Sequence, residues 1–116
     1  MILHICPASA WQAAQEAGSY RGDTLKTEGF IHCSTPEQIV DVANRFYHGQ
    51  TGMVLLVIDR AQVQARVQDE NLEGGDILFP HIYGPLNLDA VVDVISFEPQ
   101  EDGYFILPYP FQKGAR

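Results

Sequence analysis

The chain has 116 residues, 46% of them hydrophobic, which suits a single globular domain with one substantial core. Seven Lys and Arg stand against fifteen Asp and Glu, and the resulting formal net charge of -8 repels phosphate backbones and excludes extended nucleic acid from the expected partners. The longest apolar run, residues 53–58, is far shorter than the roughly 20 residues that a membrane helix needs. We therefore expect a cytoplasmic protein that does not bind membranes.

The first predicted elements are a strand and a helix. Residues 1–6 are mostly apolar and predict a strand, and Ser9 followed three residues later by Gln12 has the pattern of a capping box. The helix should run from about residue 10 to residue 17, because Gly18 is suited to the left-handed conformation that ends many helices.

A polar segment and a second helix follow. Residues 19–29 are rich in polar and turn-forming residues and predict a mobile loop beside a site. After a short strand around His32, Thr35 and Pro36 form a helix start, and apolar residues recur at helical spacing through to Gly49. Both predicted helices thus lie in the N-terminal half.

The C-terminal half is predicted to consist mainly of strands. Residues 53–58 form a continuous apolar run rich in β-branched residues, which is typical of a central strand covered on both faces. The further elements expected are a helical turn over 60–65, a brief strand at Val67, an acidic loop over 70–76, a strand over 90–97 and its hairpin partner over 104–107. Early helices and late strands favour an α+β fold with mixed or antiparallel sheets. We expect one globular domain over residues 1–110 and a disordered tail over 111–116.

Three of the four histidines, His4, His32 and His81, lie in short apolar runs that predict strands. Side chains alternate along a strand, so each histidine should face away from its apolar neighbours. Because every buried imidazole needs a hydrogen-bond partner, one polar pocket that collects all three is favoured over three separate burials. The alternative for any one of them is a loop cap or an exposed sheet face. Cys6 and these histidines lack the spacing of a zinc site, and we expect no metal.

Hydroxyl groups accompany two of the histidines. Ser34 follows His32 by two residues and Tyr83 follows His81 by two, so each pair should share a strand face and suit a polar ligand. Cys33 is adjacent to His32 and should therefore point the other way, into the core. This orientation argues against a Cys–His nucleophile.

Several segments resemble one known family along nearly the whole chain. They are 3–5, 28–34, 44–47, 54–59 and 79–87, together with Trp11, Gly18, Tyr20, Asp102, Gly103 and Phe105. On these residues the chain is identified as a member of the domain of unknown function 952 family. That family is similar in fold to the ADP-ribosyltransferase superfamily and its relatives the RNA 2′-phosphotransferases, both of which handle NAD. The resemblance implies an ADP-ribosylation-like fold whose sheets form a cleft.

The resemblance also implies roles for individual residues. His4 and His32 would be the catalytic residues, which orient the ribose of NAD and stabilise charge at its anomeric carbon. The implied substrate-binding residues are Tyr20, Ser34, Arg45, His81 and Tyr83. The implied ligand is a small-molecule nucleotide, with NAD as the substrate.

The resemblance thus implies an NAD-dependent transferase of ADP-ribosyl- or phosphotransferase type. Two further interpretations stand beside it. Mono-ADP-ribosylating members use a glutamate on a late strand, where this chain carries Asp93, Ser96 and, at the end, Glu98. The first alternative is therefore a non-catalytic module on the same fold that senses a nucleotide or binds a protein. In the second, the histidines are purely structural and there is no ligand.

Overall fold

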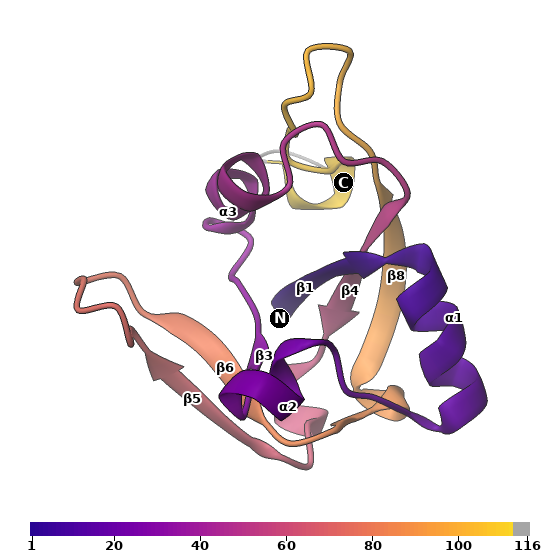
Figure 1. Cartoon of the computed structure of the whole chain (residues 1–116), viewed down its shortest axis with the longest axis vertical. Coiled ribbons are helices and arrows are strands. Elements are labelled where there is room, and N and C mark those ends of the chain that lie inside the picture. Colours follow the sequence, from indigo (N-terminus) through magenta and orange to yellow (C-terminus); the bar gives the residue numbers. More distant parts are fainter. Residues whose placement is uncertain (113–116) are drawn as a thin grey trace.

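The computed structural model describes residues 1–112 and shows an α+β fold with antiparallel sheets and, within those residues, three α-helices (Figure 1). The helices are α1 (Ala8–Ala17), α2 (Thr24–Glu28) and α3 (Ile39–Phe46). The strands are β1 (Ile2–Pro7), β2 (Ser19–Tyr20), β3 (Ile31–His32), β4 (Met53–Ile58), β5 (Arg66–Glu70), β6 (Phe79–Tyr83), β7 (Leu86–Asn87) and β8 (Val91–Phe97). Short 3₁₀ turns lie at Arg60–Gln62, Leu88–Ala90 and Tyr109–Phe111. No helix among the described residues is long and apolar enough to cross a membrane.

The strand β4 lies at the centre of the main sheet, between β1 and β8. Its apolar side chains alternate between two cores, with Leu56 and Ile58 on one face and Leu55 and Val57 on the other. The first core also includes residues of α1, β2, β3 and β6, and the second includes Ile39 and other residues of α3. The prediction of a central strand covered on both faces is therefore confirmed.

A second sheet, in the order β3–β6–β5, carries two of the three histidines of the predicted site, His32 and His81. His32 lies directly opposite His81 in the antiparallel pair of β3 and β6. This sheet is joined to the main sheet just beyond β3, where Leu3 and Ser34 exchange two backbone hydrogen bonds of 2.7 and 2.8 Å. The join places His4 of β1 next to the backbone of His32.

The first helix begins earlier than the sequence predicts. It starts at Ala8, with Pro7 as its N-cap, and Ser9 forms no capping hydrogen bond. The reason is that β1 pairs with β4 as far as Pro7, and the Ala8 N–H then donates to the Gly52 carbonyl. Ser9 therefore lies inside the helix and is not its N-cap. Gly18 ends the helix with a φ of 89°, as expected.

The segment predicted as a mobile loop, residues 19–29, instead contains β2 and α2. Its strand pairs with β7, a distant partner that local composition cannot indicate. Residues 1–112 thus contain three α-helices, where two were predicted. The last helix, α3, starts later than expected, because the Thr35 carbonyl accepts from both Gln38 and Ile39 and forms a turn that precedes it.

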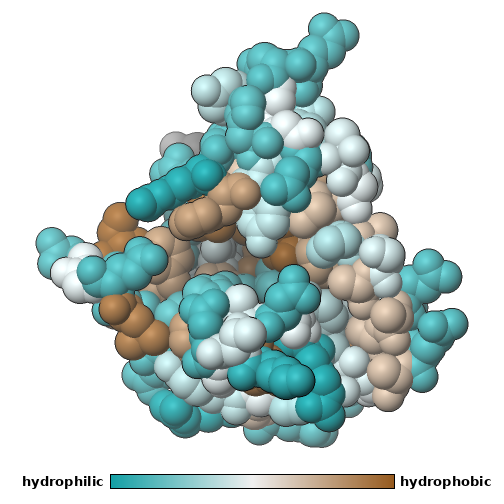
Figure 2. All heavy atoms as spheres, in the orientation of Figure 1, coloured by the Kyte–Doolittle hydropathy of each residue, from teal (hydrophilic) through white to brown (hydrophobic). Residues whose placement is uncertain are grey.

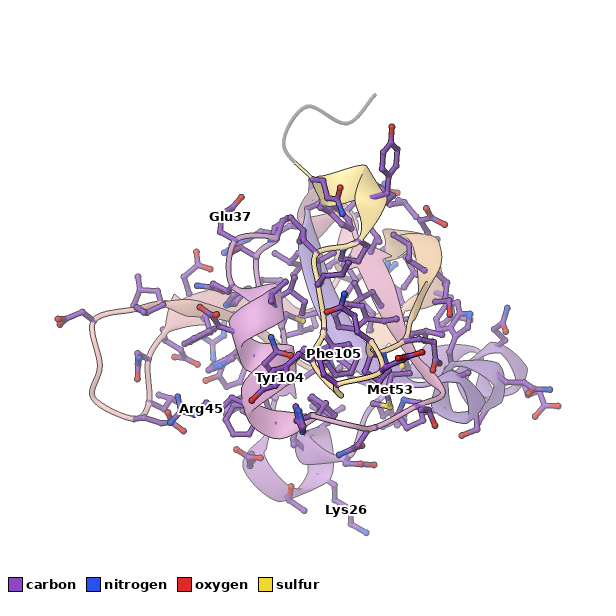
Figure 3. The ribbon with its side chains drawn as sticks, turned by 90° about the horizontal axis from the view of Figure 1, so that it is seen from above. Lys26, Glu37, Arg45, Met53, Tyr104 and Phe105 are labelled. Atoms are coloured by element: carbon purple, nitrogen blue, oxygen red, sulfur yellow. The ribbon has the colours of Figure 1, made fainter. Side chains whose placement is uncertain are left out.

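The predicted strand over 104–107 is wrong. The backbone of Phe105 bonds to the Asn44 side chain of α3 rather than to β8: its N–H donates to Asn44 Oδ1 at 2.6 Å, and its carbonyl accepts from Asn44 Nδ2 at 3.3 Å. Figure 3 shows Tyr104 and Phe105 beside this helix. The expected acidic loop also changes, since Glu70 is the last residue of β5. Of the predicted tail, residues 113–116 lie outside the described part of the chain.

Candidate functional site

A pocket of about 790 Å³ lies between the β3–β6–β5 sheet and the helix α3, and we call it the histidine pocket. Its walls come from residues 28–34, from residues 37–46, and from the β5–β6 hairpin between Glu70 and His81. Figure 2 shows this face of the molecule hollowed, with apolar atoms in the hollow and hydrophilic groups around it. The pocket therefore combines two consecutive segments with a hairpin that follows much later in the sequence.

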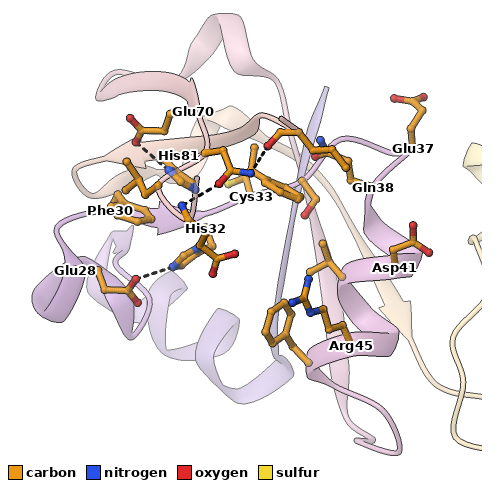
Figure 4. A pocket seen from close by; sticks show the side chains of 18 residues that line it. Glu28, Phe30, His32, Cys33, Glu37, Gln38, Asp41, Arg45, Glu70 and His81 are labelled. Carbon is orange, nitrogen blue, oxygen red and sulfur yellow. Dashed lines mark hydrogen bonds and ion pairs between the residues drawn. The ribbon is translucent and has the colours of Figure 1, made fainter. Parts of the chain in front are cut away.

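His32 and His81 lie side by side in this pocket because they are paired across two antiparallel strands, which places both side chains on one face. Their ring centroids are 5.3 Å apart and their planes are nearly perpendicular. Each ring is held by its own carboxylate, with 3.2 Å from His32 Nε2 to Glu28 Oε1 and 2.9 Å from His81 Nδ1 to Glu70 Oε1 (Figure 4). The structure therefore contains two adjacent histidine–carboxylate pairs.

Glu70 is the residue that fixes His81. Its Oε1 also accepts a short hydrogen bond from the Tyr83 hydroxyl, and the bonds from Tyr83 and His81 lower the pKa of the Glu70 carboxyl. An ionised carboxylate only accepts, so His81 donates through Nδ1, and in the neutral ring Nε2 is the acceptor. Phe30 stacks on the same ring with centroids 4.1 Å apart. The His81 side chain is only 7% exposed and has a fixed orientation.

His4 lies outside this pocket. Its Nδ1–H donates to the His32 carbonyl at 2.6 Å, and the Tyr20 hydroxyl donates to its Nε2 at 2.7 Å. It lines a separate hollow of about 50 Å³. Burial lowers the pKa of His4 to about 4, so the ring is neutral at pH 7. His4 thus supports the backbone that carries His32, and the catalytic and binding roles expected for His4 and Tyr20 stay predictions.

The other expected site residues are divided between the pocket and its surroundings. Ser34 lines the pocket, and Arg45 lines it from the α3 side. Tyr83 contacts the pocket through Glu70, which it hydrogen-bonds. Cys33 is buried as predicted, and burial raises the pKa of its thiol, which keeps it protonated and unreactive.

The charge of the pocket is strongly one-sided. Its lining includes the carboxylates of Glu28, Glu37, Asp41, Glu70 and Glu73. Arg45 is the single Lys or Arg among the described residues that line it. Within residues 1–112, no three His, Cys, Asp or Glu side chains are grouped so that they could hold a metal ion. The sequence analysis missed the roles of Glu28 and Glu70. Glu28 ends α2 four residues before His32, and Glu70 meets His81 through the pairing of β5 with β6.

The comparisons with known proteins agree with the family indicated by the sequence. The family described as "Protein of unknown function (DUF952)" matches residues 5–94. The crystal structure of protein CC0527 from Caulobacter crescentus is 31% identical in sequence, with a TM-score of 0.82 over 91% of this chain and 93% of that chain. The solution NMR structure of CC0527 gives a TM-score of 0.78 over 89% of each chain. Among curated proteins, none matches the chain. The chain therefore belongs to the DUF952 family, whose function is unknown.

Proposed function

We propose that the protein binds a small organic molecule in the histidine pocket, and that NAD or a related nucleotide is the first candidate. The observation that carries the proposal is the cross-strand pair of His32 and His81, each bonded to a carboxylate inside one pocket. Ligand sites are typically pockets of this size with mostly apolar walls and a few oriented polar groups. A purely structural pair would not need an open volume of about 790 Å³ beside it.

The walls of the pocket suit a ligand with a planar ring. Phe30 and His81 form a stacked pair, and the ring of Phe79 also lines the pocket. On the facing wall, Arg45 offers one guanidinium for a phosphate, and Ser34 adds a hydroxyl. Oxidised NAD fits this charge pattern better than other dinucleotides, because its nicotinamide ring is cationic. An ADP-ribosylation-like fold with a ligand cleft is part of the same proposal.

The histidine pairs can also transfer protons. The unpartnered nitrogen of an imidazole bonded to a carboxylate is a good general base, and His32 and His81 provide two such rings. We propose that in a transferase His32 would orient the attacking group and His81 would take its proton. The non-catalytic alternative is favoured by a specific observation: Asp93, Ser96 and Glu98 are absent from the described lining of the pocket.

The test is to record backbone amide chemical shifts of the isotope-labelled protein while NAD and ADP-ribose are titrated. We expect shift changes in residues 28–34, 41–46 and 70–81. These changes should be lost in His32→Ala and kept in His48→Ala, because His48 packs on Tyr104 and does not line the pocket.

No change at millimolar nucleotide would remove NAD and ADP-ribose from the proposal. Prolonged incubation followed by product analysis separates the two functional classes. Consumption of NAD, or loss of a 2′-phosphate from RNA, indicates the enzyme, whereas binding without any product indicates the module.

A further inference from the structure

We propose that the histidine pocket selects a planar cation, namely a ligand with an amidinium, a guanidinium or a cationic aromatic ring at the end that enters it. This inference rests on the proposed ligand site but not on the ligand being a nucleotide. It follows from three independent features of the lining: the balance of charges, the hydrogen-bonding groups that are left free, and the aromatic surface.

The first feature is uncompensated negative charge. Glu28 and Glu70 are bonded to histidines, whereas Glu37, Asp41 and Glu73 have no ion-pair partner within residues 1–112. All three of these residues are exposed and line the same pocket. A concave site lined by one sign of charge concentrates the opposite ion, so the pocket attracts cations and repels anions.

The second feature is the hydrogen bonding of the lining, in which both side-chain amides are engaged with the backbone of the hairpin. Gln38 Nε2 donates to the Leu78 carbonyl and Asn71 Nδ2 donates to the Ile77 carbonyl, each at 2.7 Å. These bonds hold the hairpin in place and use one of the two N–H donors of each amide. The one cationic donor among the described lining residues is the Arg45 guanidinium, and Ser34 adds a hydroxyl.

The histidines add to the acceptors. Because Glu28 accepts from His32 Nε2 and Glu70 accepts from His81 Nδ1, each ring in its neutral form presents its other nitrogen as an acceptor. No described residue bonds to His81 Nε2, although this side chain is more than nine-tenths buried. A ligand that meets two imidazole acceptors and several carboxylates must be rich in N–H donors.

The third feature is the aromatic surface. Phe30 is stacked on His81 inside the pocket, and Phe46 lies at its α3 side with 60% of its surface exposed. Aromatic faces attract cations, and flat rings bury their surfaces efficiently against such walls. A flat cation therefore satisfies the charge, the acceptors and the aromatic walls together.

The experiment uses three probes of nearly the same shape and size: benzamidine, benzamide and benzoate, with charges of about +1, 0 and -1 at neutral pH. Their dissociation constants are measured by calorimetry or NMR at pH 7.5 in low salt. We expect benzamidine to bind about fivefold or more tighter than benzamide, which corresponds to about one favourable ion pair, and benzoate to bind weakest. Raising the salt concentration should shrink the difference between benzamidine and benzamide.

Charge variants supply the matched control. Asp41→Asn combined with Glu73→Gln should weaken the binding of benzamidine severalfold and leave the binding of benzamide unchanged, because the substitutions remove only the attraction between opposite charges. Glu101→Gln removes an exposed carboxylate that does not line the pocket, and it should change the affinity for neither probe.

The outcomes also separate this inference from the nucleotide proposal. Benzamidine selectivity without any response to NAD supports the planar cation and rejects the nucleotide. A response to ADP-ribose with benzamidine binding no better than benzamide or benzoate does the reverse. Failure of all three probes to bind at millimolar concentration overturns the inference.

Discussion

Tyr20 is the hydrogen-bond partner of the second ring nitrogen of His4. Its hydroxyl donates to His4 Nε2, and without this bond the nitrogen would lose its only hydrogen-bond partner among the described residues. We expect Tyr20→Phe to lower the free energy of unfolding by about 1–3 kcal/mol, the usual cost of such a loss. Urea unfolding measures the change. The control is Tyr104→Phe, whose ring is 53% exposed, and an equal loss in both variants would contradict the assignment.

His4 should also make stability depend on pH. Burial lowers its pKa from 6.5 to about 4 in the folded protein, so between these values the unfolded chain binds the proton and the folded chain does not. The free energy of unfolding should therefore fall as the pH falls from about 6.5 to about 4, by at most about 1.4 kcal/mol per pH unit. In His4→Gln, which cannot titrate, urea midpoints over this range should change less than in the wild type. His48→Gln should retain the wild-type slope.

At the scale of the elements, Asn44 of α3 holds the segment that follows β8. Its side chain accepts from the Phe105 N–H and donates to the Phe105 carbonyl. We expect Asn44→Ala to cost about 1–3 kcal/mol and to speed the exchange of the Phe105 amide hydrogen, because a buried backbone pair loses both partners. Arg45→Ala, on an exposed position of the same helix, should leave this amide protected. Protection that persists in Asn44→Ala would show that the segment is held by its apolar contacts alone.

The same segment shows where prediction from sequence reaches its limit. The run over 53–58 identified β4 because a continuous apolar run rich in β-branched residues is typical of a strand that is buried on both faces. The run over 104–107 is also apolar, but composition does not reveal that Asn44 replaces a neighbouring strand. The alternation of side chains along a strand correctly predicted that Cys33 is buried in the core. The pairing of His32 with His81 is a register between distant strands, which no local pattern contains.

At the scale of the whole molecule, β4 joins the two cores because adjacent residues of this one strand belong to different cores. Leu55 is in the second core and Leu56 is in the first, and both are fully buried. A cavity in the second core should therefore weaken the whole fold. We expect Leu55→Ala to cost about 2–5 kcal/mol.

Two probes test whether this loss is shared by both cores. Trp11 packs against the first core, so its fluorescence follows a region that Leu55 does not belong to, whereas far-UV circular dichroism follows all elements. If the domain unfolds as one unit, both signals in Leu55→Ala should shift to the same lower urea midpoint, with the wild-type dependence on urea. Val92→Ala, on an exposed position of β8, should leave both midpoints nearly unchanged. A fluorescence midpoint that stays at the wild-type value while the dichroism midpoint falls would mean that the two cores unfold independently.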